Sequence, residues 1–509
     1  MRHLPVSELL STALGEAEFM RHIPRHRRVY EAIRKAILNQ QLPPGSKLPS
    51  TRDLARDLSL SRNTILTAFQ QLLAEGYVIA QTGSGTFVAN TPPDSQLASE
   101  HRSTEKRHAG AGTLSSRAKK PAEHILRFSE RGIRLTSRPA GRDFEIQPFA
   151  PGMADFSIFP FKLWQRLQNR YWRDAHTELL DYGGAGGYLP LRCAVAKYLR
   201  VSRSVNLTVD QVLITSGTQQ SLNLCAQLLA DTGDTAWVED PCYWGARSVF
   251  EACDLRLHSV IVDNEGLSPQ AADLQTAPRL IYLTPSHQYP KGVVMSLARR
   301  RLMLDIAERK QAWILEDDYD SEFRYAGRPI ASLQGLDPYE RVVYLGTFSK
   351  MLYPGIKIGY MVVPIALQEG FKTALYDLQR PGQMMLQAAL SDFMEEGYFG
   401  THIRKLRLLY GQRRELLLKT MQNVLGSAAR ISSEESGLHL VLELPREIDD
   451  VALARTAMEY NMNVRALSTY YLGNSPTRGL VIGYAYVVPE KIIFYGRLLA
   501  NIVKAKIKP

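Results

Sequence analysis

The sequence predicts two folded units: a small N-terminal unit of three helices and a β-hairpin at residues 1–89, and a large α/β domain at residues 146–509. Three observations predict this division. Apolar residues recur at helical spacing near the N-terminus, large apolar residues become scarce between residues 90 and 145, and β-rich runs alternate with helical stretches beyond that point. With 509 residues and 45% apolar composition, the chain can build a core in each unit.

The N-terminal unit begins with an amphipathic helix, and two shorter helices follow it. The first helix is predicted from apolar residues at positions i, i+4, i+7 and i+8: Val29, Ile33, Ala36 and Ile37. Ser50 and Ser61 are the predicted N-caps of the next two helices, and Gly76 is predicted to end the third. Short β runs at residues 77–80 and 86–89 flank a glycine-rich turn and predict a hairpin. This is the layout of a winged helix-turn-helix.

The run PPGSKLPSTRDLARDLSLSRNTILTAFQQLLAEGYVIAQTGSGTFV resembles the GntR-type winged helix along its whole length. The resemblance implies that double-stranded operator DNA is a partner of the chain. It also implies seven positions that face DNA, five on the helices and two glycines in the wing: Arg52, Arg62, Asn63, Thr64, Thr67, Gly83 and Gly85. Arginine and asparagine suit this role because they pair bidentately with guanine and adenine edges. Without the resemblance, the same residues are explained equally well as a solvated helix face.

Residues 90–145 are predicted to be a flexible basic linker. The stretch is rich in Ser, Thr, Ala, Gly and Pro, and it has too little apolar surface to offset the entropy of ordering. Residues 1–90 and 91–145 each carry a net charge of +4 out of +11 for the chain, so the remainder is close to neutral. A basic N-terminal quarter favours a polyanionic partner, although a solvated basic surface explains the charge as well.

Composition excludes several other classes of protein. No membrane association is expected, because the longest uncharged stretch, residues 211–230, carries Thr, Ser, Gln and Asn throughout. Acidic residues interrupt any apolar run near the N-terminus, so no secretory signal is expected. The four cysteines lack a CxxC spacing, which predicts reduced thiols, no metal site and a cytoplasmic location.

Five apolar runs of the large domain each lead into a polar cluster. The clusters are Ser216-Gly217-Thr218-Gln219, Glu239-Asp240-Pro241-Cys242-Tyr243, Thr284-Pro285-Ser286-His287-Gln288, Glu316-Asp317-Asp318-Tyr319 and Gly346-Thr347-Phe348-Ser349-Lys350. In open α/β sheets, ligands bind beyond the carboxyl ends of the strands. The clusters therefore predict a ligand site where these strands end.

The residue types in the clusters indicate which ligand binds there. Residues 216–219 open a helix whose free N–H groups suit a phosphate. Lys350 is placed to form a Schiff base with an aldehyde cofactor, and Asp317 to keep a pyridine nitrogen protonated. Tyr243 could stack on a flat ring. Each residue alone has an ordinary explanation, as a helix cap, surface lysine, strand-end carboxylate or packing aromatic, and it is their coincidence that predicts the cofactor.

From about Gln147 to its end the chain resembles the α/β fold-type I aminotransferases, which bind pyridoxal 5′-phosphate (PLP) and combine a large mixed-sheet domain with a smaller α+β C-terminal subdomain. The resemblance rests on the blocks FAPGMADFSIFPFKLW, DYGGAGGYLPLR, LTPSHQYPKG, LEDDYDSEFRY and GTFSKMLYPGIKIGY. Combined with the GntR-like head, it makes the chain similar to the MocR/GabR family of regulators. It also implies a homodimer in which the winged helix of one chain lies against the aminotransferase-like domain of the other.

By this resemblance, Lys350 is the lysine that bonds to PLP, and nine further residues contact the cofactor. They are Asp317 at the ring nitrogen, Tyr319 at the ring hydroxyl, Tyr243 against the ring, Thr218, Gln219, Thr347, Ser349 and Lys357 around the phosphate, and Tyr182 reaching the phosphate of the neighbouring subunit.

Three positions depart from the family pattern. Lys357 stands where the family carries a phosphate-binding arginine, so the charge is kept without the bidentate fork. Gly245 stands where the GABA-responsive member has an arginine. In the stretch GLVIGYA, Val481 stands where aminotransferases carry the arginine that grips the substrate carboxylate, although Arg478 is close by. These departures argue against efficient transamination and against GABA as the effector.

The resulting prediction is a PLP-dependent transcriptional regulator that binds operator DNA and senses PLP, or an adduct of PLP with an amine or amino acid. It is expected in the bacterial cytoplasm, and on the nucleoid when DNA is bound. The competing class is a catalytically active PLP-dependent aminotransferase with an accessory DNA-binding head. A third class, a non-specific DNA-compacting protein, predicts binding without sequence preference.

Overall fold

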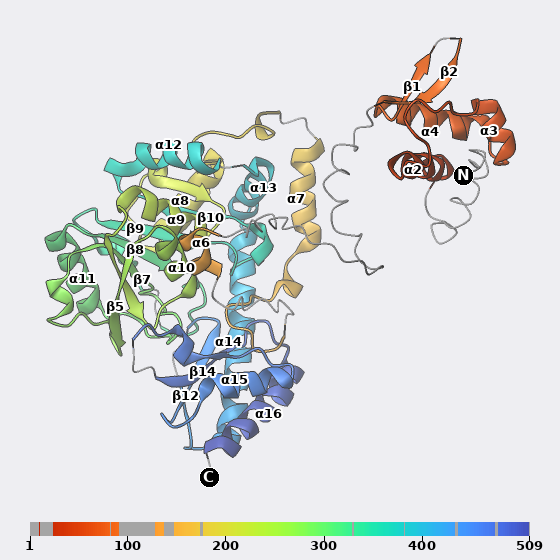
Figure 1. Ribbon diagram of the computed structural model, residues 1–509. Helices are drawn as coiled ribbons and strands as arrows, with labels where there is room; N and C mark the ends of the chain where they lie inside the picture. Colours follow the sequence, from red (N-terminus) through yellow and green to blue (C-terminus); the bar gives the residue numbers. More distant parts are fainter. Residues whose placement is uncertain are drawn as a thin grey trace, which may run out of the picture. The chain divides into compact units, whose positions relative to one another are not determined.

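The computed structural model describes Leu10 and residues 24–81, 83–90, 128–136, 147–173, 177–327, 330–380, 382–432, 436–473 and 477–507. The chain divides into two compact units, Met1–His124 and Ile125–Pro509 (Figure 1). Each unit has a hydrophobic core of its own. Most of the predicted linker, residues 91–127 and 137–145, lies outside the described residues.

The first unit has the predicted three helices and hairpin. Its elements are α2 (Arg25–Leu38), α3 (Thr51–Asp57), α4 (Arg62–Ala74), β1 (Val78–Gln81) and β2 (Gly85–Val88). Both predicted N-caps are confirmed, because the Ser50 hydroxyl accepts a hydrogen bond from the Asp53 amide at 3.2 Å and the Ser61 hydroxyl accepts one from the Thr64 amide at 3.2 Å. Gly76 follows the end of α4 with φ +77°, a conformation that favours glycine after a helix.

The wing has a third strand-like segment that the sequence did not suggest. Residues 45–48 run beside β2, where the Leu48 amide donates to the Thr86 carbonyl at 2.8 Å and Lys47 forms a bridge with Phe87. The Lys47 ammonium lies 5.8 Å from the centre of the Phe87 ring. The segment follows two prolines and a glycine, which predict only a turn. It places one more cation at the wing.

The second unit is built on an eight-stranded sheet of order β3-β10-β9-β8-β7-β4-β5-β6. The strands are β3 (Val212–Thr215), β4 (Thr235–Asp240), β5 (Arg256–Asp263), β6 (Gly266–Leu267), β7 (Pro278–Leu283), β8 (Trp313–Asp318), β9 (Val342–Thr347) and β10 (Gly359–Val362). The run β9-β8-β7-β4-β5 is parallel, and β10 is antiparallel to both β3 and β9. Strand β3 therefore points the same way as the parallel run. The carboxyl ends of β3, β4, β7, β8 and β9 consequently lie at one edge, as predicted.

Helices cover both faces of this sheet, which explains why its strands are apolar on both sides. The helices of this part are α7 (Phe161–Arg173), α8 (Leu189–Arg203), α9 (Thr218–Leu229), α10 (Trp244–Ala252), α11 (Leu297–Lys310), α12 (Gln368–Gln379) and α13 (Met384–Glu395). Leu213 packs in one core with residues of α9, α10 and α12, while its neighbours Val212 and Ile214 pack on the other face with α8. Helix α11 packs beside Trp237 of β4 and Ile314 of β8.

A long helix, α14 (Tyr398–Leu425), leads into a smaller α+β subdomain. Its four-stranded antiparallel sheet has the order β11-β12-β14-β13, and its helices pack beside it. The elements are β11 (Arg430–Ile431), β12 (His439–Leu444), α15 (Asp450–Glu459), β13 (Arg465–Ala466), β14 (Arg478–Gly483) and α16 (Pro489–Ile507).

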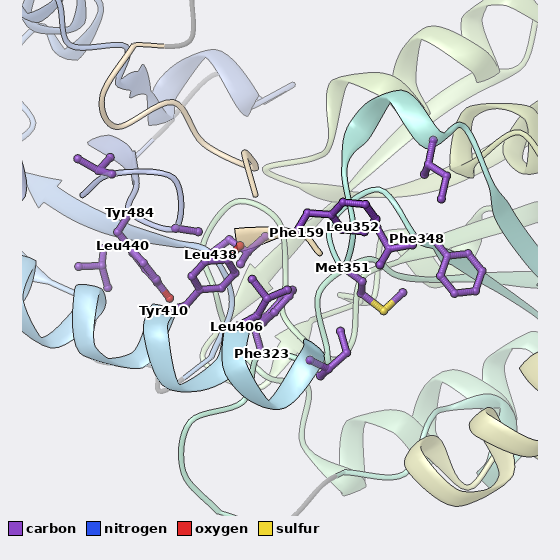
Figure 2. Close-up of a cluster of buried hydrophobic side chains, with 14 of the residues drawn as sticks. Phe159, Phe323, Phe348, Met351, Leu352, Leu406, Tyr410, Leu438, Leu440 and Tyr484 are labelled. Atoms are coloured by element: carbon purple, nitrogen blue, oxygen red, sulfur yellow. The ribbon is translucent and has the colours of Figure 1, made fainter. Parts of the chain in front are cut away.

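One buried cluster joins this subdomain to the large sheet (Figure 2). Leu406 and Tyr410 come from α14, Phe348 comes from the segment that follows β9, and Leu440 and Tyr484 come from β12 and the end of β14. A shared core of this kind holds the subdomain against the sheet edge where the site is expected.

The predicted linker boundary differs from the structure at one point. A short helix, α6 (Glu130–Thr136), lies inside the range 90–145, belongs to the second unit and packs on α10. Arg131 makes an ion pair with Asp254 at the end of α10. The composition of the whole stretch concealed this helix, because seven helical residues contribute little to an average over 56 positions.

Candidate functional site

A cavity of about 340 Å³ lies where the five strands of the large sheet end. The residues that line it are Pro151, Gly152, Ser216, Gly217, Thr218, Gln219, Gln220, Tyr243, Tyr282, Thr284, Tyr289, Asp317, Tyr319, Thr347, Ser349, Lys350 and Lys357. Nine of the ten predicted cofactor residues are therefore brought together around one space, and their individual roles stay predictions.

The tenth, Tyr182, does not line the cavity. Its ring is 56% exposed and lies 4.7 Å from the guanidinium carbon of Arg380. This is compatible with a role toward a neighbouring subunit, as the resemblance implies, and not with a contact to the cavity of its own chain.

Lys350 lies just beyond β9, and its amine points into the cavity. The amine donates a hydrogen bond to the Gly152 carbonyl at 2.6 Å. Burial lowers the pKa of the Lys350 amine, while Asp320 and Asp317 act in the opposite direction. The neutral amine, which is the form that attacks an aldehyde, is consequently more populated than in a surface lysine.

Asp317 is the next-to-last residue of β8, and one of its carboxylate oxygens is hydrogen-bonded while the other is free. Oδ2 accepts a hydrogen bond from the Tyr282 hydroxyl at 2.8 Å. Oδ1 is buried and has no hydrogen-bond partner among the described residues. Burial raises the pKa of Asp317 to about 7. A buried acceptor without a partner is costly, so this oxygen is placed for a donor that the chain does not supply.

The opposite end of the cavity is a helix N-terminus surrounded by hydroxyl groups. Gly217 precedes α9 with φ +123°, which presents the first amides of the helix to the cavity. A side chain at Gly359 would come within 2.7 Å of the Gly217 Cα, so the start of β10 packs closely against this segment. Thr347 accepts a hydrogen bond from the Ser349 amide at 3.1 Å, and Lys357 supplies a cation. Amide, hydroxyl and ammonium donors together suit a phosphate.

Aromatic rings form the remaining wall. Tyr243 meets Tyr289 edge to face at 5.8 Å and accepts a hydrogen bond from the Gln219 amide group at 3.2 Å. Tyr289 meets Tyr319 at 5.7 Å, and the His287 ring lies 3.0 Å from the Tyr319 hydroxyl and 2.9 Å from the Asp320 carboxylate. Burial raises the pKa of Tyr243 to about 12, so this phenol stays protonated.

Several residues of the site had no predicted role, although they lie in or near the predicted strand-end clusters. Tyr282 holds Asp317, Tyr289 lines the cavity, and Glu239 holds Thr284 at 2.6 Å. Tyr282 lies inside an apolar run, where an aromatic residue reads as core. Its link to Asp317 comes from strand register, because Tyr282 lies beside Leu315 in the next parallel strand, two positions before Asp317, and this pairing is visible only in the structure.

The positions that depart from the family pattern have structural explanations. A side chain on Gly245 would come within 2.0 Å of the Gln219 amide nitrogen and 2.4 Å of the Tyr243 ring, so an arginine would displace both. Val481 is fully buried in an apolar cluster. Arg478 does not take its place, because it pairs with the buried Asp450 at 3.1 Å and does not line the cavity.

The predicted DNA-facing residues share the surface of α3, α4 and the wing. Arg52, Arg62, Asn63, Thr67 and the glycines of the turn are exposed, and Thr64 is half-buried with its hydroxyl 2.8 Å from Ser61. The apolar face of α4, which includes Ile65 and Phe69, packs in the core instead. Helix α4 therefore presents a polar face to solvent, with Lys47 on the wing as a further cation.

The cavity fits PLP on two independent grounds. The unpartnered Asp317 oxygen meets the need of a protonated ring nitrogen, and the donors around Gly217 meet the need of a phosphate. With a buried lysine amine beside them, these features define a PLP-binding domain of the aminotransferase type. No helix in the described ranges is long and apolar enough to cross a membrane, and no group of three or more metal-ligating side chains is found among those residues.

Comparison with known proteins agrees with both units. Residues 156–484 match the family described as aminotransferase class I and II, and residues 25–88 match bacterial regulatory proteins of the gntR family. The chain is 39% identical, over 92% of its length and 91% of the relative's, to the probable rhizopine catabolism regulatory protein MocR of Rhizobium meliloti. It is 30% identical to the pyridoxine biosynthesis regulator PdxR of Corynebacterium glutamicum, over 89% of this chain and 90% of that one.

A solved structure is similar to the second unit. The kynurenine aminotransferase of Pyrococcus horikoshii, in complex with PMP, aligns with a TM-score of 0.67 and 26% identity over 76% of this chain and 96% of that one. The chain belongs to the MocR/GabR family of GntR-type regulators, with a class I and II aminotransferase domain and PLP as the cofactor that this domain implies.

The raised pKa of Asp317 predicts a pH dependence in protein prepared without PLP. The folded carboxyl takes up its proton near pH 7, the unfolded one near 3.8, so the folded state binds more protons between these values. The free energy of unfolding should therefore rise as the pH falls from about 7 to 4, by up to about 4 kcal/mol from this group. Urea unfolding at pH 5 and pH 7.5 measures this rise in the free energy of unfolding. The rise should be smaller in Asp317→Asn than in the unmodified protein, and an equal rise would contradict the prediction.

Proposed function

We propose that the protein binds operator DNA through α3, α4 and the wing, and that its PLP domain is the sensor that controls this binding. The signal is PLP, or an adduct of PLP with an amine or amino acid. The observation that carries the proposal is the presence, in one chain, of an exposed polar recognition helix and a cavity lined by a half-buried lysine and by a carboxylate with a free oxygen.

The residues of the cavity have separate tasks. When bound, PLP supplies an aldehyde that condenses with primary amines and a ring that withdraws electrons. Lys350 is the residue whose amine would hold the aldehyde carbon. Asp317 holds a proton at the ring nitrogen, and Tyr282 fixes the orientation of that carboxylate. The Gly217 turn, Ser349 and Lys357 hold the phosphate.

Sensing requires that the signal favour one state of the regulator. A ligand that binds two arrangements equally well changes neither population, so occupancy of the cavity must alter the state that binds DNA. The Asp240 carboxylate accepts hydrogen bonds from the Leu472 and Gly473 amides at 2.8 and 3.0 Å, which ties a strand end of the large sheet to the C-terminal subdomain. This contact is a place where cavity occupancy can shift the subdomain.

A homodimer is the assembly that we propose. Its support on this chain is a set of exposed large apolar side chains between α7 and the start of α8: Phe161, Trp172, Leu180, Tyr182 and Leu189. Exposed apolar groups gathered over one stretch are typical of an interface. The bacterial cytoplasm, with the nucleoid when DNA is bound, is the location proposed for such a regulator.

A working aminotransferase remains the second candidate function. The observation in its favour is that the lysine amine and the carboxylate needed for PLP chemistry are both in place. Sustained conversion of an amino acid in the presence of a keto acid would support it, and a single half-reaction without turnover would support the sensor.

Replacement of Arg62 by alanine should weaken operator binding by about 1–3 kcal/mol and relax sequence preference at one position. Arg62 is exposed at the first turn of α4. Lys35→Ala, on α2, removes the same charge without touching α4 and should reduce affinity slightly and equally for all sequences. Titrations of each variant with operator DNA and with unrelated DNA, at physiological salt, measure the loss of affinity and the change in sequence preference. Equal losses on the two DNAs for Arg62→Ala would contradict base recognition.

A further inference from the structure

The cavity has cations at only two of the described lining positions. They are Lys350, which reacts with the aldehyde, and Lys357, beside the phosphate-binding turn. The hydroxyl groups of the aromatic wall are largely engaged, since Tyr289 bonds Tyr470 at 3.1 Å and Tyr319 lies against His287. No guanidinium group lines the cavity among the residues that the structure describes. A carboxylate buried here would lack the charged partner that offsets its desolvation.

The sheet of the C-terminal subdomain holds an arginine, Arg465, beside Val481. Val441, Val481 and Arg465 are directly paired across β12, β14 and β13, so their side chains share one face. Val441 and Val481 pack on Tyr470, Trp244 and Tyr289, which places this face behind the aromatic wall. Arg465, on β13, therefore lies one strand nearer the edge of this sheet than Val481, on β14.

Arg465 is held outside the cavity by aromatic stacking. Its guanidinium carbon lies 5.9 Å from the centre of the Trp244 ring, and Trp244 is stacked on Tyr470 with centroids 4.8 Å apart. Tyr470 in turn bonds Tyr289, which lines the cavity. Arg465 therefore does not line the cavity, and these contacts connect it to the lining through the rings of Trp244, Tyr470 and Tyr289.

We propose that the effector is a primary amine with no carboxylate on the carbon that bears the amino group. This rests on the proposed function and names the ligand class of the same cavity. The amino group takes the place of the Lys350 amine, and the body of the ligand, apolar or hydroxylated, packs on Tyr243 and Tyr289. Val481 is the residue to which we assign this preference, because it is fully buried behind the aromatic wall and supplies no cation there for a carboxylate.

Matched pairs of ligands test the proposal in the full-length, PLP-loaded protein. 2-Phenylethylamine and L-phenylalanine, and isobutylamine and L-valine, differ only by the carboxylate. Dissociation constants come from the change in cofactor absorbance and, independently, from calorimetry. The amine of each pair should bind at least about tenfold more tightly than its amino acid, the lower end of the effect expected for an unpaired buried charge. An amino acid that binds as tightly as its amine would overturn the proposal.

Two variants sharpen the result. Val481→Arg should improve amino-acid binding about tenfold or more and leave the amines weaker or unchanged. Arg465→Met should change neither ligand, and a loss of amino-acid binding in it would show that Arg465 reaches the cavity, which overturns the proposal. If Val481→Arg does not fold, the ratio of the amine and amino-acid dissociation constants in the unmodified protein still tests the proposal. Protein that takes up PLP but responds to neither ligand would refute this inference alone, whereas failure to take up PLP would refute the proposed function.

Discussion

Lys350→Ala abolishes the covalent attachment of PLP, so that borohydride reduction fixes the cofactor to the unmodified protein and not to the variant. Lys350 is the lysine whose amine lines the cavity beyond β9, where it donates to Gly152. Burial lowers the pKa of this amine, which favours the nucleophilic form. Without it, PLP is held only by the phosphate donors and Asp317. Mass spectrometry after borohydride reduction measures the loss.

Lys291→Ala is the matched control for this experiment. Lys291 is also partly buried, burial likewise lowers its pKa, and its amine donates to the Val262 carbonyl at 3.1 Å away from the cavity. This variant should still bond to PLP covalently. Cofactor fixed by borohydride to Lys350→Ala, or its loss from Lys291→Ala, would show that the reactive lysine has been misassigned.

The largest loss of stability is expected for Arg203→Met. Arg203 on α8 makes an ion pair with Asp318 at 2.7 Å, with side chains 6% and 0% exposed, and donates to the Ile330 carbonyl at 2.7 Å. Removing one partner leaves a buried carboxylate without its counter-charge, which costs about 3–5 kcal/mol. Urea unfolding of the PLP-loaded protein measures the change, and the adjacent Asp317 should also lose its fixed position.

Lys419→Met serves as the comparison for an exposed pair. Lys419 and Glu415 lie 2.7 Å apart on α14 with side chains 68% and 63% exposed, so the loss should be about 0.3–0.5 kcal/mol. A double variant, Arg203→Met with Asp318→Leu, should recover part of the loss because no buried charge remains. Equal destabilisation by Arg203→Met and Lys419→Met would contradict the role given to the buried pair.

The two-unit architecture and the edge of the sheet that holds the site were predictable from local signals. Serine caps, helical spacing and apolar runs ending in polar clusters are short-range features, and Ser50, Ser61 and the strand β3 lie where they were expected. The helix α6 was not predictable in this way, since it packs on α10 and its Arg131 bonds Asp254, 123 positions further along the chain.

The residues that form the site were predictable from the sequence, but the hydrogen bonds and strand pairings that connect them were not. Lys350 and Asp317 follow from their positions at strand ends, which the pattern shows directly. The hydrogen bond from Tyr282 to Asp317, and the row that places Arg465 beside Val481, depend on which strands are neighbours and in what register. Such long-range pairings leave no trace in the spacing of a single sequence.

The most direct measurement is footprinting of the DNA around the gene of this protein, with PLP-free, PLP-loaded and Lys350→Ala protein. A regulator whose PLP domain controls its winged helix should protect a defined sequence, and its affinity for that sequence should change at least about tenfold, or ~1.4 kcal/mol, when PLP is bound. Lys350→Ala should not show this change. Protection that is identical in all three preparations, or that covers DNA without sequence preference, would contradict the coupling of the two units.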